Sequence, residues 1–153
     1  MRTLNYILSG LILSGMIFAS GCGDDDPDIT MTEAEKRIEL LSSLTWKFST
    51  VTQDGVNIST AFNSATLNFT ITGTFSTSNI DPDYALIFPA SGSWSIPDDT
   101  QINQILFNNI PMTISNATAT ALTLEFSFLG PSANSGGRIN SLDGDYVVTF
   151  TPN

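Results

Sequence analysis

From Trp46 onward, apolar and polar side chains alternate along this chain with a period of two residues. The alternation is clearest in residues 66–76, 121–129 and 146–151. Between positions 122 and 128, Leu and Phe occupy every second position, and Thr, Glu and Ser stand between them. Successive side chains of a strand point to opposite faces, so these runs predict strands with one buried and one solvated face. That pattern is typical of antiparallel sheet, and we expect the body of the chain to be all-β.

Turn-forming sequences separate the alternating runs. Asp54-Gly55 and Asp143-Gly144 are dipeptides of the hairpin type. Gly73 stands where the apolar face of its run should continue, which indicates a hairpin turn or a bulge. Shorter alternating segments lie at 46–53, 91–96, 101–108 and 112–116. The resulting set of about seven or eight short strands is expected of an antiparallel barrel or, alternatively, of a β-sandwich.

One segment before the strands has a helical pattern. Thr32 followed by Glu35 fits a capping box, in which each side chain bonds the backbone N–H of the other residue. Ile38, Leu41 and Leu44 then form an apolar stripe at helical spacing. We therefore expect a short N-terminal helix that packs on the sheet as a lid or plug.

The first residues have the features of an export signal. Arg2 supplies a positive charge, and residues 7–19 are uncharged but shorter than the roughly 20 apolar residues that cross a bilayer. Residues 1–21 are thus predicted to be a secretory signal peptide that is removed. The small residues 19–21 before Cys22 resemble a lipobox, which implies diacylation of Cys22. Cys22 is the only cysteine, so no disulfide can form within the chain.

An acidic cluster follows the cysteine. Asp24, Asp25 and Asp26 repel one another and would extend the chain as a solvated tether. Such a cluster resembles the export signal of Bacteroidota lipoproteins, which implies a place on the outer face of the outer membrane. The alternative is an anchor that faces the periplasm. The expected organisation is a signal peptide at 1–21, a lipidated acidic tether at 22–31 and one barrel domain with its N-terminal helix at 32–153.

Two tryptophan motifs carry a wider family resemblance. Leu44-Thr45-Trp46 opens the first predicted strand, and Gly92-Ser93-Trp94 follows a Thr-rich hairpin. From about residue 38 to the end, the chain resembles the lipocalin-like lipoproteins of Bacteroidota, although Leu44 stands where true lipocalins have glycine. The resemblance implies an up-and-down, calyx-like β-barrel that binds a small apolar or glycan ligand.

The composition excludes several classes of function. The chain has no histidine, which removes Ser-His-Asp triads and ordinary zinc sites. It has no phosphate-binding glycine loop, and its net charge of -10 repels nucleic acids. The carboxylate pairs are Asp81 and Asp83, Asp98 and Asp99, and Asp143 and Asp145. Turn sequences favour Asp for local backbone bonding, so we expect no enzyme activity, no metal site and no cofactor.

The aromatic residues leave two hypotheses for function. As a carrier, the domain would line a calyx with aromatic side chains, for which the candidates are Phe75, Trp94 and Phe107. As a cell-surface interaction or accessory protein, it would have a filled core, no small-molecule ligand and contacts through loops such as 130–137. In either case the predicted membrane contact is the lipid anchor on Cys22, and we expect a monomer.

Overall fold

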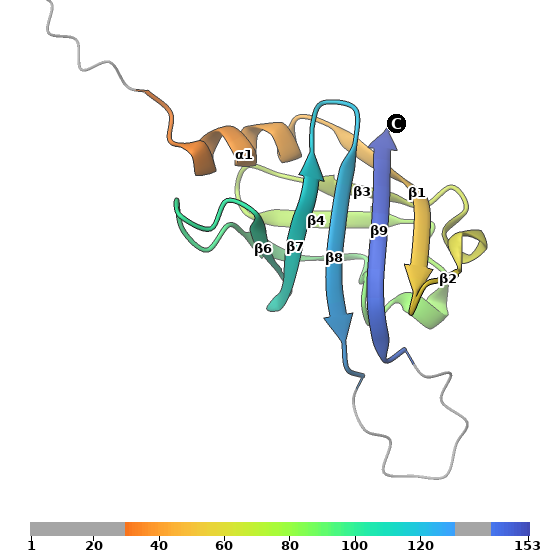
Figure 1. The fold of residues 1–153 in the computed structure, drawn as a ribbon. Helices are drawn as coiled ribbons and strands as arrows, with labels where there is room; N and C mark the ends of the chain where they lie inside the picture. The colour runs from red at the N-terminus through yellow and green to blue at the C-terminus, as the bar shows by residue number, and fades with distance from the viewer. Residues whose placement is uncertain (1–29, 131–141) are drawn as a thin grey trace, which may run out of the picture. The chain divides into compact units, whose positions relative to one another are not determined.

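Eight antiparallel strands close into a barrel, and a ninth short strand pairs beside them (Figure 1). This computed structural model describes residues 30–130 and 142–153, within which Met31–Asn153 form one compact unit. The barrel strands are β1 (Thr45–Gln53), β3 (Thr66–Phe69), β4 (Thr74–Ser78), β5 (Ser91–Ser95), β6 (Gln104–Phe107), β7 (Ile110–Ala117), β8 (Leu122–Phe128) and β9 (Gly144–Pro152). Each pairs with the next along the chain, and β9 pairs back on β1. The predicted all-β, up-and-down barrel with a short N-terminal helix is confirmed, and the β-sandwich alternative is wrong.

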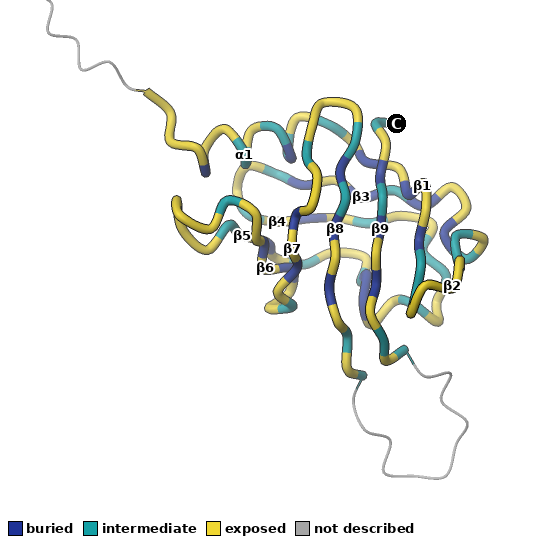
Figure 2. The backbone as a smooth tube through the Cα atoms, viewed as in Figure 1, coloured by how far each residue is buried: buried dark blue, intermediate teal, exposed yellow. Residues whose placement is uncertain are grey.

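The alternating runs became strands because most of their apolar positions face inward. Burial along β8 alternates residue by residue, with Leu122, Leu124 and Phe126 buried (Figure 2). The run at 66–76 makes two strands, because Gly73 adopts φ +80° in the turn between β3 and β4. Ile71 consequently lies in that turn with 75% of its surface exposed, so its predicted place on the apolar face is wrong.

The other predicted turns had different outcomes. Asp54 and Gly55 both have positive φ and join β1 to β2 (Val56–Asn57) as a tight hairpin. Asp143-Gly144 is not a hairpin turn, because Gly144 already belongs to β9 and pairs with Phe128. The chain between β8 and β9 includes residues 131–141, which lie outside the described part.

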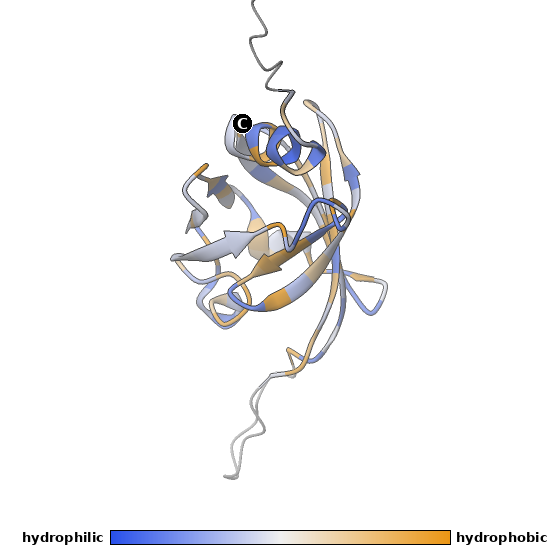
Figure 3. Ribbon diagram, turned by 90° about the vertical axis from the view of Figure 1, so that its left-hand side faces the viewer, coloured by the Kyte–Doolittle hydropathy of each residue, from blue (hydrophilic) through white to orange (hydrophobic). Residues whose placement is uncertain are grey.

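The helix α1 (Glu33–Ser42) lies at one end of the barrel (Figures 1 and 3). Its predicted capping box is present, with Glu35 N–H donating to Thr32 at 3.1 Å and Thr32 N–H donating to Glu35 at 2.7 Å. Leu41 is fully buried, and its carbonyl accepts a hydrogen bond of 2.9 Å from the indole N–H of Trp46. The helix is therefore fixed to the first barrel strand by both apolar packing and a buried hydrogen bond.

Aromatic side chains from several elements fill the interior. The ring of Phe88 comes from the connection between β4 and β5, which also contains the short helix η2 (Pro82–Tyr84). That ring lies 5.1 Å from Phe48, 6.0 Å from Phe107 and 6.0 Å from Phe126. Because these three partners belong to β1, β6 and β8, Phe88 occupies the middle of the lumen.

Candidate functional site

The three aromatic candidates for ligand binding are part of this packed core. Phe75 and Phe107 stack with centroids 3.8 Å apart, and both are at most 2% exposed. Trp94 packs on Phe69 at 4.8 Å and donates its indole N–H to the carbonyl of Thr70 at 3.0 Å. The structure thus brings the candidates together, but it surrounds them with other side chains.

The lumen also lacks the polar groups that orient a ligand. Among residues 30–130 and 142–153, no polar or charged residue is buried. Small-molecule sites usually combine apolar walls with a few convergent polar groups. An eight-stranded barrel is only just wide enough for its own side chains or one small ligand. Here the core aromatic side chains, with Phe88 among them, fill the lumen.

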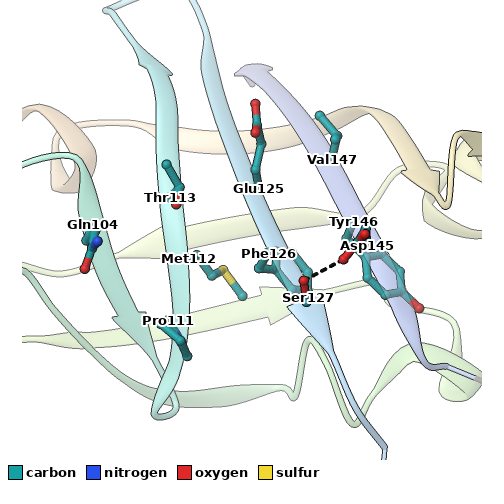
Figure 4. A pocket seen from close by; sticks show the side chains of 10 residues that line it. All are labelled: Gln104, Pro111, Met112, Thr113, Glu125, Phe126, Ser127, Asp145, Tyr146 and Val147. Carbon is teal, nitrogen blue, oxygen red and sulfur yellow. Dashed lines mark hydrogen bonds between the residues drawn. The ribbon is translucent and has the colours of Figure 1, made fainter.

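A groove of about 570 Å³ lies instead on the outside of β6, β7, β8 and β9 (Figure 4). It is open to solvent and is lined by Gln104, Pro111, Met112, Thr113, Glu125, Phe126, Ser127, Asp145, Tyr146 and Val147. Most of these residues come from β7, β8 and β9, so long strands rather than loops hold the walls in place.

The groove lies where the pairing of β7 and β8 ends. The two strands are paired from Ala117 and Leu122 as far as Thr113 and Glu125. Beyond that point β8 stays paired only with β9, and β7 only with β6. Pro111 stands two residues beyond Thr113, and proline has no N–H to donate to a neighbouring strand. The barrel wall therefore splits at this position.

Carboxylates dominate the charge of the groove. Glu125 lies outside on β8, and Asp145 of β9 accepts a hydrogen bond of 2.5 Å from the hydroxyl of Ser127 (Figure 4). The groove lining includes neither Lys nor Arg among the residues that the structure describes. Its potential is accordingly negative, in line with the net charge of the whole chain.

Tyr146 forms the floor of the groove at the end nearest the β8–β9 connection. It is 1% exposed, and its hydroxyl donates to the carbonyl of Leu142 at 2.8 Å. Burial, with smaller contributions from Tyr84, Asp54 and Asp143, raises the pKa of Tyr146 to about 12. The phenol is thus neutral at ordinary pH and serves as a hydrogen-bond donor.

One member of each carboxylate pair accepts a hydrogen bond from a backbone N–H. Asp81 caps η2 by accepting from the N–H of Asp83 at 3.0 Å, and Asp143 accepts from Gly130 N–H at 2.6 Å. Hydrogen bonds from Thr100 hold the pKa of Asp98 below its usual value. Asp145, however, lies within β9 rather than in a turn. In the part of the chain that the structure describes, no three acidic, histidine or cysteine side chains are grouped so as to hold a metal ion.

Other predicted features fall outside the described residues. Cys22 and the acidic residues Asp24, Asp25 and Asp26 precede residue 30, and most of the loop 130–137 is also outside. None of the described helices is long and apolar enough to cross a bilayer.

Sequence reasoning missed both the outer groove and the filling of the lumen by Phe88. Two signals for them were nevertheless present. Pro111 interrupts a run that otherwise predicts a strand, and proline in a strand indicates an edge. Ile87-Phe88 is an apolar pair between the predicted strands at 66–76 and 91–96, and both side chains are buried.

The fold and the groove define a small up-and-down β-barrel with a filled lumen and an acidic outer groove. No protein-family model matches the chain, and the comparison with curated proteins finds no match. What the barrel does is therefore argued from its geometry.

Proposed function

We propose that this chain is a lipid-anchored interaction or accessory protein of the bacterial cell surface. It is held to the outer membrane by acyl chains on Cys22, and it works through its outer surface without a small-molecule ligand. The observation that carries the second part is the filled lumen. Phe88 lies at the centre of the barrel, within 5.1–6.0 Å of rings on three strands and on the helix η1 (Ser59–Phe62).

A carrier of one small apolar or glycan ligand is the second candidate. The closed eight-stranded topology and the helix at one end of the barrel favour it, because barrels of this size can hold a small ligand. Binding would require Phe88 to leave the lumen, which would uncover the apolar rings that it now contacts.

Native mass spectrometry separates the two candidates. The polypeptide from residue 23 onward keeps the whole compact unit Met31–Asn153, including the core and the closed ladder of strands. Purified gently from its own host and then incubated with lipids and oligosaccharides, it should show its bare mass. A reproducible additional mass that is lost on denaturation would overturn the proposal and identify the size of a ligand.

The anchor is tested by metabolic labelling of the full chain with an alkyne-bearing palmitate. We expect label on the native chain and none on the variant Cys22→Ala, because the acyl chains need the thiol. Protease treatment of intact cells should digest the native protein from outside. Label on Cys22→Ala would contradict the lipid anchor, and full protection from protease would favour the periplasmic face.

A further inference from the structure

The ladder between β7 and β8 ends at Thr113 and Glu125, so Ser127 of β8 has no paired residue on β7. Asp145, which lies opposite Ser127 on β9, directs both of its backbone groups to Asp54 on the other side. Its carbonyl accepts from Asp54 N–H at 2.8 Å, and its N–H donates to the Asp54 carboxylate at 2.9 Å. In antiparallel sheets, residues that face each other either exchange both hydrogen bonds or direct both away. Ser127 therefore points its N–H and C=O away from β9, toward β7.

The residue of β7 that should meet Ser127 is Pro111. Thr113 pairs with Glu125, and two further residues along each strand lead to Pro111 and Ser127. The N–H of Ile114 donates to Asn103 on the β6 side at 2.7 Å, so by alternation position 111 faces β8. Proline has no N–H there, so the carbonyl of Ser127 has no donor from β7. The split is thus a strand edge with one donor and one acceptor in register.

The side chains around this edge favour one kind of occupant. Met112 and Phe126 line the floor of the groove with 1% and 7% of their surfaces exposed, while Glu125 and Asp145 add negative charge on the outer face (Figure 4). An added strand alternates its side chains, so one face would meet the apolar floor and the other the carboxylates. Lys or Arg at alternate positions would match that charge.

We propose that the split between β7 and β8 takes up an extended, basic segment of a partner protein, which pairs with the edge of β8 as an added strand. The inference rests on the proposed interaction function and specifies its partner. Backbone pairing supplies affinity in this mode of recognition, and alternate side chains supply specificity.

The test uses capped octapeptides and the ¹⁵N-labelled polypeptide from residue 23 onward. A peptide of alternating lysine and valine should shift the amide signals of Phe126–Phe128 and of Ile110, Met112 and Thr113. A peptide of alternating glutamate and valine should bind at least tenfold more weakly, because the carboxylates repel it. The lysine peptide methylated on its lysine backbone nitrogens, which would face Ser127, should also lose at least tenfold, because that edge of the added strand then lacks donors. Absence of binding, shifts confined to other strands, or equal binding of the two charge types would overturn the inference.

A variant that closes the split provides the second test of strand addition. Pro111→Val restores the missing N–H, so it should extend the β7–β8 ladder, slow the hydrogen exchange of the Ser127 amide and reduce lysine-peptide binding at least tenfold. Pro152→Val, at the far end of β9, is the matched control and should bind as the native protein does. If exchange shows that the split stays open in Pro111→Val, Ser127→Pro removes the edge N–H directly and should weaken binding. Native-like binding by a closed Pro111→Val, or by Ser127→Pro, would contradict strand addition.

These outcomes are distinct from failure of the proposed function. A bare native mass without peptide binding would overturn only the strand addition. A retained small molecule would overturn the interaction function itself.

Discussion

At the scale of single residues, Phe88 and Pro111 have the largest consequences for what the barrel can do. Phe88 fills the lumen from a connection rather than from a strand, and it contacts rings from β1, β6 and β8. Pro111 removes one donor from β7 and leaves the outer wall split where the groove lies. Phe88 thus fills the lumen, whereas Pro111 leaves a gap in the barrel wall.

Tyr146 makes the stability of the barrel sensitive to alkaline pH. Its pKa is about 12 in the folded protein, whereas an unfolded tyrosine titrates near 10. Above about pH 10 the unfolded chain therefore loses this proton first, and rising pH favours unfolding until the folded phenol also ionises near pH 12. Solvent screening reduces the effect of this shift, so we expect Tyr146 to contribute about 1–2 kcal/mol of stability that is present below pH 10 and lost toward pH 12.

The comparison of the native protein with Tyr146→Phe measures this contribution. Chemical denaturation at pH 8 and at pH 11 should show a smaller loss of unfolding free energy for the variant. All other ionisable groups are common to the two proteins, so their contributions cancel in the difference. An identical loss in the two proteins would mean that the buried phenol does not couple to unfolding.

The sequence predicted the positions of some core residues but not of others. Phe75, Trp94 and Phe107 were correctly placed on the inner face, because alternation determines which face a strand residue joins. Whether that face lines a cavity depends on what else enters the lumen. Phe88 enters from a connection that has no period, so the apolar pair Ile87-Phe88 indicates burial but not which part of the interior the ring occupies.

At the scale of elements, α1 depends on its N-terminal cap. The reciprocal bonds between Thr32 and Glu35 satisfy two backbone N–H groups at the start of a helix of only ten residues. Helices this short are marginal in isolation, so the cap and the packing of Leu41 both contribute to the stability of the end of the barrel.

Replacing Thr32 with alanine should lower the unfolding free energy by about 1 kcal/mol, because the Glu35 N–H loses its acceptor. Urea denaturation measures the change. Thr30→Ala is the matched control, since Thr30 is exposed and precedes the cap, and it should stay within about 0.5 kcal/mol of the native protein. An equal effect of the two substitutions would show that the cap does not stabilise the helix.

Elements with a strong local signal were the ones that the sequence predicted well. The capping box of α1, the strand β8 and the Asp54-Gly55 hairpin all have the structure that their residues indicated. Asp143-Gly144 did not, because the neighbouring strands decide where β9 begins, and Gly144 pairs with Phe128. The split between β7 and β8 likewise depends on two strands meeting in one register, which no single segment contains.

At the scale of the whole molecule, closure of the barrel leaves the groove as an accessible strand edge. Barrel closure removes the free edges of an open sheet, which are otherwise sites of pairing with other chains. Here β9 pairs with β1 along most of its length, so the ladder is continuous there. The groove adds an accessible edge on β8, and its carboxylates limit which chains can pair there.

The proposed function depends on a lumen that is filled by the barrel's own side chains. The most direct test is a titration of the native protein and of Phe88→Ala with benzene, followed by NMR. Removing the Phe88 side chain should cost about 3–5 kcal/mol of stability and leave an apolar cavity lined by the surrounding rings. The account predicts that Phe88→Ala binds benzene and shifts the signals of Phe48, Phe107 and Phe126, while the native protein does not bind. Benzene that enters the lumen of the native protein would contradict the account and restore the carrier as the leading candidate.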